Sequence, residues 1–261
     1  MSKARELANL RGTPTDSNIL LQSTAGDAIT AGSGTCNIAV GLNAFGAGTT
    51  GDDNVAIGRL AIGTGATTGT GNIGLGISAL SAVIGGTNNI GMGLTAADAV
   101  TTGTDNVAIG RLAFSASTDG ADNIAIGRSA LAVSGNDGDT NIAIGLAALG
   151  TGDVAGAGNI GLGASALTAL TSGTNNIAMG LTSADALLSG TDNIAIGRLA
   201  ASALVPIATL QAPEIEAPDA FCPIAILLAP VSAPSIAFVP SAILFAPLVT
   251  HLIASTPNAI L

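Results

Sequence analysis

The sequence predicts an all-β protein, a parallel β-solenoid of the β-roll type with coils of 17 or 18 residues. A unit of the form N-[IV]-[AG]-[VILM]-G-x-x-[AS] begins ten times at that spacing, which is typical of a stacked repeat. The 261 residues include 36 Gly but no Trp and no Tyr, so small and branched side chains have to build the core. The units begin at Asn37, Asn54, Asn72, Asn89, Asn106, Asn123, Asn141, Asn159, Asn176 and Asn193.

The first half of each unit predicts a β-strand. Apolar residues at positions 2 and 4, such as Ile38 and Val40, alternate with Ala or Gly at position 3, such as Ala39. This is the period of two that a strand requires. We expect the large aliphatic residues to fill the interior and the Ala/Gly face to lie outside, where it leaves the surface slim enough for close approach of another backbone.

A glycine ends each predicted strand at position 5. A glycine fixed at this place indicates a positive φ or a close approach of another chain segment. After it, an Ala followed by an apolar residue predicts a second short strand, and a polar turn closes the coil. The glycines are Gly41, Gly58, Gly76, Gly93, Gly110, Gly127, Gly145, Gly163, Gly180 and Gly197.

Stacked coils would place the ten asparagines in one file. Their amides are expected to bond to the coils above and below, as in an asparagine ladder. A three-sided left-handed β-helix, which also uses about 18 residues per turn, stays open. It would need a third buried corner twelve residues after the first Ile of a unit. That position holds mostly polar residues, namely Thr50, Thr67, Gly85, Thr102, Asp119 and Asn136, which favours the flatter roll.

Composition divides the chain into three parts. Residues 1–36 precede the repeats and are expected to cap or dock the shaft, which covers residues 37–203. Residues 204–261 form an apolar, proline-rich tail that keeps a 17-residue period, as in Pro206 and Pro223. Proline at this density excludes a helix. The first residues contain no apolar run, so we expect no signal peptide, and no segment indicates a transmembrane helix.

Charge and residue chemistry argue against several functions. The net charge is −10, which disfavours nucleic acid as a partner because phosphate contacts need clustered Lys and Arg. The only histidine, His251, has no acidic or thiol neighbour in sequence, and Cys36 and Cys222 stand far apart. We therefore predict that the chain is not an enzyme and has no metal, no cofactor and no small-molecule substrate.

Charged residues recur at two positions of the unit. Arg follows the fixed Gly, and Asp precedes the leading Asn, four times each. Surface ion pairs between adjacent coils are the expected role, and each would contribute little to stability. A charged stripe that binds a ligand is the alternative. The residues are Arg59, Arg111, Arg128 and Arg198, with Asp53, Asp105, Asp122 and Asp192.

The units NVAIGRLA and NIAIGRSAL resemble the repeats of trimeric autotransporter adhesin heads and the NxAIGxxAL repeats of bacteriophage tail fibres. In those families the motif forms a parallel β-roll and three chains pack together. The resemblance covers residues 37–203 and implies a homotrimer, with the Ala/Gly face, Phe45, Leu80 and Phe114 at the seam between chains. The opening MSKARELANL is similar to the start of many phage tail-fibre proteins, which favours the phage family.

We therefore expect a structural fibre or shaft of a phage virion, such as a tail fibre or appendage, with host attachment as a further role. Its location would be the virion or the extracellular space. The expected partners are other copies of the chain, virion proteins and the host cell surface. Two alternatives remain: a self-assembling extracellular filament or adhesin, and an ice-binding solenoid. Ice binding would use a file of threonines that is interrupted at Ala121, Asp139 and Ala157: Thr35, Thr70, Thr87, Thr104, Thr174 and Thr191.

Overall fold

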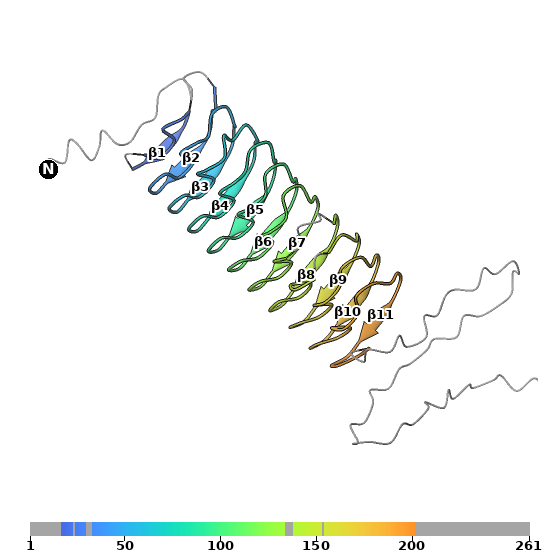
Figure 1. Ribbon diagram of the computed structural model, residues 1–261. Helices are drawn as coiled ribbons and strands as arrows, with labels where there is room; N and C mark the ends of the chain where they lie inside the picture. Colours follow the sequence, from blue (N-terminus) through green and yellow to red (C-terminus); the bar gives the residue numbers. More distant parts are fainter. Residues whose placement is uncertain (1–16, 23, 30–32, 134–137, 153, 202–261) are drawn as a thin grey trace, which may run out of the picture. The chain divides into compact units, whose positions relative to one another are not determined.

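The structure, a computed structural model, describes residues 17–22, 24–29, 33–133, 138–152 and 154–201. Within them, eleven three-residue strands form one parallel sheet, and each strand pairs with its neighbours in sequence order (Figure 1). The chain is thus the predicted β-solenoid, with coils of about 17 residues. The strands are β1 (Ile19–Leu21), β2 (Ile38–Val40), β3 (Val55–Ile57), β4 (Ile73–Leu75), β5 (Ile90–Met92), β6 (Val107–Ile109), β7 (Ile124–Ile126), β8 (Ile142–Ile144), β9 (Ile160–Leu162), β10 (Ile177–Met179) and β11 (Ile194–Ile196).

Equivalent positions of successive coils lie side by side. Ile38 is paired with Val55, and the same register holds from β1 to β11. The backbone N–H of Ile38 donates to the Asn54 carbonyl at 2.8 Å, and the N–H of Gly58 donates to the Val40 carbonyl at 2.8 Å. Because the pairing partner is always the next repeat, a coil depends on its neighbours for stability.

One coil precedes the ten that begin at Asn37. β1 follows Asn18, whose Oδ1 accepts a hydrogen bond from the backbone N–H of Asn37 at 2.7 Å. The sequence pattern misses this coil because Leu20 stands where the repeats have Ala or Gly, and Gln22 stands where they have Gly. The solenoid therefore begins inside the segment that was predicted to precede it.

The second strand predicted in each coil is wrong. After position 5 the chain forms a turn, in which positions 7 and 9 have φ near +50°, as at Leu112 (59°) and Phe114 (51°). Left-handed residues at alternate positions are incompatible with a strand. The turn brings two consecutive residues, Ala113 and Phe114, into the core together, whereas a strand would place them on opposite faces.

The two faces of the sheet are the reverse of the prediction. From β2 to β11 the central Ala or Gly is buried, whereas the aliphatic residues on either side are half-buried or exposed. The large aliphatic residues of the strands therefore do not fill the interior. The predicted solenoid is confirmed, but the predicted orientation of the strand side chains is wrong.

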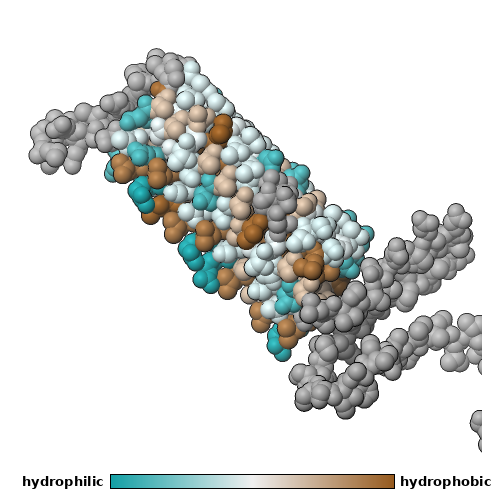
Figure 2. All heavy atoms as spheres, in the orientation of Figure 1, coloured by the Kyte–Doolittle hydropathy of each residue, from teal (hydrophilic) through white to brown (hydrophobic). Residues whose placement is uncertain are grey.

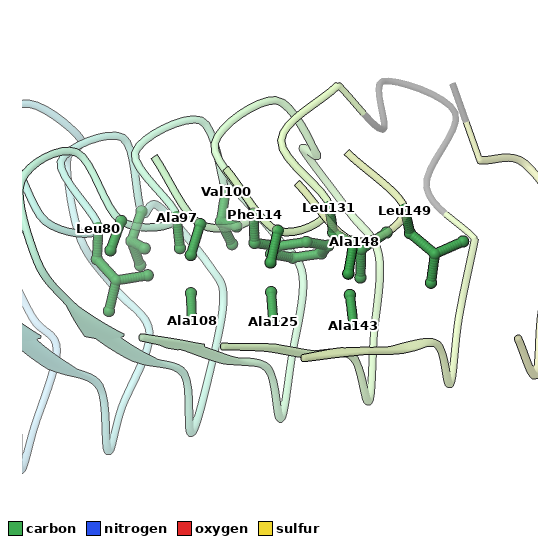
Figure 3. Packing of buried hydrophobic residues seen from close by; sticks show 14 of the residues in the cluster. Leu80, Ala97, Val100, Ala108, Phe114, Ala125, Leu131, Ala143, Ala148 and Leu149 are labelled. Atoms are coloured by element: carbon green, nitrogen blue, oxygen red, sulfur yellow. The ribbon is translucent and has the colours of Figure 1, made fainter. Parts of the chain in front are cut away.

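The reason is the thickness of the interior. The wall opposite the sheet contributes large buried side chains at position 9, and some coils add a second buried residue further along the turn, such as Val100 (Figure 3). A Cβ added to Gly91 would lie 2.8 Å from Cγ of Leu80, so little more than a hydrogen or methyl fits on the strand side. The buried position-9 residues with large side chains are Phe45, Ile62, Leu80, Phe114, Leu131, Leu149 and Leu167.

This packing overturns the predicted inter-chain seam. Phe45, Leu80 and Phe114 are fully buried within their own chain, and so is the Ala/Gly face of the strands. Neither is available to another copy. The proline-rich tail, His251 and Cys222 lie outside the described residues, which all belong to the first of two units of the chain, Met1–Ala229.

Candidate functional site

The asparagines of position 1 form a hydrogen-bonded ladder along the core. Oδ1 of Asn89 accepts the backbone N–H of Asn106 at 3.1 Å and its Nδ2 at 2.9 Å. Nδ2 of Asn106 also donates to the Gly120 carbonyl at 2.7 Å, which closes its own coil. Because the side chains from Asn37 to Asn176 are buried and bonded to the coils on both sides, the ladder satisfies polar groups that the tight coil would otherwise bury without partners.

The carbonyl that receives the amide belongs to a glycine that the sequence analysis did not single out. This glycine stands three residues before the next Asn in all ten cases, so the signal G-x-x-N was present in the sequence. A Cβ on Gly103 would lie 2.5 Å from the Gly120 carbonyl oxygen and 3.1 Å from Nδ2 of Asn106. The ladder thus needs glycine opposite each asparagine. These glycines are Gly34, Gly51, Gly69, Gly86, Gly103, Gly120, Gly138, Gly156, Gly173 and Gly190.

The glycine at position 5 has both a positive φ and a close neighbouring backbone, as the sequence predicted. Its φ lies between +126° and +140° in all ten coils, a region closed to other residues. A Cβ on Gly110 would lie 2.5 Å from the carbonyl oxygen of Gly127 in the next coil. These positions hold the strand ends in register, and with them the side chains of the outer surface.

The outer surface of the sheet is an unbroken aliphatic ladder. Ile57, Ile109 and Ile144 are 42%, 36% and 40% exposed, far more than core residues. Figure 2 shows hydrophobic residues alternating with hydrophilic ones along the lower left edge of the described solenoid, a mixed pattern that differs from the all-apolar positions 2 and 4. We call positions 2 and 4 of β2 to β11 the outward face: Ile38, Val40, Val55, Ile57, Ile73, Leu75, Ile90, Met92, Val107, Ile109, Ile124, Ile126, Ile142, Ile144, Ile160, Leu162, Ile177, Met179, Ile194 and Ile196.

Charged residues border the outward face on both sides. The residue before Asn lies at one margin and position 6 lies at the other, and the four Asp and four Arg residues at these places are all exposed. Position 6 also carries exposed aliphatic residues, namely Leu42, Ile77, Leu94, Leu146 and Leu181. No ion pair joins these eight charged residues in the described part of the chain, where position 6 of one coil lies beside position 6 of the next, as Arg111 lies beside Arg128.

Two carboxylates in the turn are incompletely paired. Oδ1 of Asp98 and Oδ1 of Asp185 are buried without a hydrogen-bond partner. Burial raises the pKa of Asp98 above 3.8, and the backbone hydrogen bond that opposes this effect is the smaller influence. A raised folded-state pKa means that the carboxyl favours folding below its unfolded pKa, and that this contribution is lost as the pH rises through the folded pKa.

We therefore expect Asp98→Asn to raise the denaturation midpoint more at about pH 7 than at about pH 3, because the partial burial of this carboxyl penalises its charged form. Urea denaturation of both proteins at the two pH values measures this difference. The same substitution at exposed Asp27 is the control and should change neither midpoint. An equal gain for Asp98→Asn at both pH values would show that desolvation of the charge is not the cause.

Other candidate sites receive no support from the geometry. Among the described residues no three His, Cys, Asp or Glu side chains lie together as metal ligands, and no helix there is long and apolar enough to cross a membrane. Cys36 is exposed with a free thiol. The threonine file also contains Asp52, whose Oδ1 accepts hydrogen bonds from the backbone N–H and the hydroxyl of Thr35 at 2.6 and 3.0 Å.

No protein family, curated protein or solved structure matches the chain. The resemblance to tail-fibre and adhesin repeats therefore rests on the motif alone, and the outward face is the feature from which function has to be argued.

Proposed function

We propose that the chain is the shaft of a phage virion fibre, in which copies of the chain, three by resemblance to tail-fibre repeats, associate through the outward face. The observation that carries this proposal is the exposed aliphatic ladder, which repeats in every coil from β2 to β11. Soluble monomers rarely expose a continuous apolar surface of this size, and such a surface usually marks an interface.

The size of the outward face suits a stable interface. Counted from position 2 to position 6, which also carries exposed aliphatic residues, each of the ten rungs is about five residues wide, and at about 4.8 Å per rung this gives a surface of about 800 Å². A standard protein interface takes about 800 Å² from each partner. The face is also rigid, because each strand from β2 to β10 is bonded to two neighbours, so little conformational entropy is lost on docking.

The repeat suits a mechanical role. Every described rung presents the same backbone pairing and almost the same side chains, so the shaft carries many equal contacts. The length of the shaft then depends only on the number of coils. A spacer or an attachment arm needs a length that can be set in this way.

We expect light scattering on the full chain to give a multiple of the 24.9 kDa chain mass, three-fold if the resemblance holds. Replacing Ile57, Ile109 and Ile144 with Thr should yield a monomer with an unchanged far-UV circular dichroism spectrum, since these side chains stand outside the core.

The matched control replaces exposed aliphatic residues of the turns, Ile84, Val133 and Leu188, with Thr. This variant should keep the wild-type mass. A monomeric wild-type chain would refute self-association. Immunogold labelling of phage particles that encode the chain tests the location, and unlabelled particles would remove the virion assignment while leaving self-association intact.

A further inference from the structure

The two charged margins of the outward face vary together. Whenever Arg occupies position 6 of a unit, Asp precedes the Asn of the same unit, and the remaining six of the ten units carry neither. The four pairs are Asp53 and Arg59, Asp105 and Arg111, Asp122 and Arg128, and Asp192 and Arg198. Because residues 159–203 repeat residues 72–116, the pair Asp192 and Arg198 is a copy of Asp105 and Arg111, and three separate occurrences favour a dependence between the two positions.

Within one chain the two positions do not meet. Asp105 and Arg111 stand at opposite ends of β6, and a strand extends by about 3.3 Å per residue, so their side chains lie well beyond ion-pair distance. Oδ1 of Asp105 instead accepts from Nδ2 of Asn88 in the preceding coil at 3.1 Å. Among the described residues no ion pair joins any of the eight charged groups.

The arrangement is also unfavourable for an isolated chain. Asp105 and Asp122 belong to adjacent rungs of one margin, and Arg111 and Arg128 belong to the same two rungs of the other margin. Neighbouring rungs lie about 4.8 Å apart, so like charges are stacked on both sides. Like charges directly opposite each other on neighbouring strands are destabilising. Opposite charge brought from outside the chain would relieve both stacks.

We propose that a second copy of the chain docks parallel and in register, so that the Arg margin of one copy meets the Asp margin of the other at the same rung. This inference rests on the proposed self-association through the outward face and specifies its orientation and register. A rotation about an axis parallel to the shaft brings the end of each strand of one copy to the start of the equivalent strand of the next copy. All four pairs then form between copies.

Other arrangements fail on charge. A two-fold axis parallel to the strands would reverse the shaft direction and bring Asp against Asp and Arg against Arg. A parallel arrangement shifted by one rung matches only one of the four pairs, because adjacent charged rungs occur only at β6 and β7. The charges thus favour one orientation and one register of the two copies. The aliphatic residues alone would allow one copy to slide along the other.

Three charge variants of the full chain test the proposal. The first replaces the four Arg with Asp, and the second replaces the four Asp with Arg. The third makes both changes, so that the charges are exchanged and the composition is that of the wild type. The first two variants should associate about tenfold more weakly or worse in low salt, since each has like charges at both margins. The exchanged variant should associate like the wild type.

The first two variants move the net charge in opposite directions from −10, so a general charge effect cannot weaken both. Weakened association of the exchanged variant, or unchanged association of both single-sign variants, would overturn the inference. An oligomeric wild type with unaffected variants would leave the proposed function standing and remove only the charge pairing. A monomeric wild type would remove both.

Cross-linking tests the register independently of charge. Cys36 is exposed directly before Asn37, and Leu42 is position 6 of the same unit. In a chain with Leu42→Cys and Cys222→Ser, in-register docking places the two thiols of neighbouring copies together. A short thiol cross-linker should then join the copies, and the mass of the product counts them.

The control for register places the second thiol two coils away, with Ile77→Cys in place of Leu42→Cys. This variant should give no cross-linked product. Equal cross-linking of the two variants, or a product from the control alone, would contradict in-register docking whatever the charge variants do.

Discussion

We expect Gly110→Ala to lower the free energy of unfolding by about 2 to 5 kcal/mol. The φ of Gly110 is +132°, where residues with a Cβ are strained by about 1 to 3 kcal/mol. The new Cβ would also lie 2.5 Å from the carbonyl oxygen of Gly127, which belongs to the backbone of the next coil. Relief requires the two coils to separate, and separation breaks the hydrogen bond from the Gly127 N–H to the Ile109 carbonyl or its neighbours in the ladder.

Gly85→Ala is the matched control because Gly85 lies in the turn between coils of the same shaft. Its Cβ would approach no atom closer than Thr102 Cγ2, at 3.9 Å, and its φ is not positive. We expect this variant to be as stable as the wild type or slightly more stable, since Ala restricts the unfolded chain. Urea denaturation of both variants measures the difference. Equal stability of the two would show that position 5 does not need glycine.

The regular features of the fold follow directly from the sequence. The repeat length, the strand at positions 2 to 4 and the asparagine ladder could be predicted because positions 1 to 5 of the unit hardly vary. The same holds for the glycine at position 5. The prediction of which strand face is buried failed because it assumed that larger apolar side chains lie inside. Position 9 holds Phe45, Leu80 and Phe114, and these residues already fill a thin interior, so that only Ala or Gly fits opposite them. The space available across the coil decides which face of the strand is buried. The hydropathy pattern of a single strand carries no information about that space.

The candidate site was hidden by the same error. With the aliphatic residues assigned to the core, the charged residues at either end of the strand looked like ordinary surface groups of adjacent coils. Once Ile57 and Ile109 are known to face outward, Asp53 and Arg59 become the two borders of an apolar surface. The correlation between the borders was in the sequence, but only the three-dimensional arrangement shows that it is not satisfied within one chain.

The reversed faces predict effects of very different size for substitutions at two adjacent residues of β7. Ala125 is fully buried between the strand and the position-9 row, whereas Ile126 is on the outward face (Figure 3). Ala125→Ile should destabilise the monomer by about 3 kcal/mol or more, because the interior has no room for added methylene groups. Ile126→Ala removes a partly exposed side chain and should cost less than about 1 kcal/mol.

Both changes should be made in the chain that carries Thr at positions 57, 109 and 144, so that dissociation does not contribute to the measured stability. Urea denaturation then reports on the coil alone. The aliphatic interior that the sequence pattern suggests would give the reverse order, with Ile126→Ala the more damaging change because it would leave a core cavity. The order of the two denaturation midpoints therefore decides which face of the sheet is buried, and it does so without reference to the oligomer.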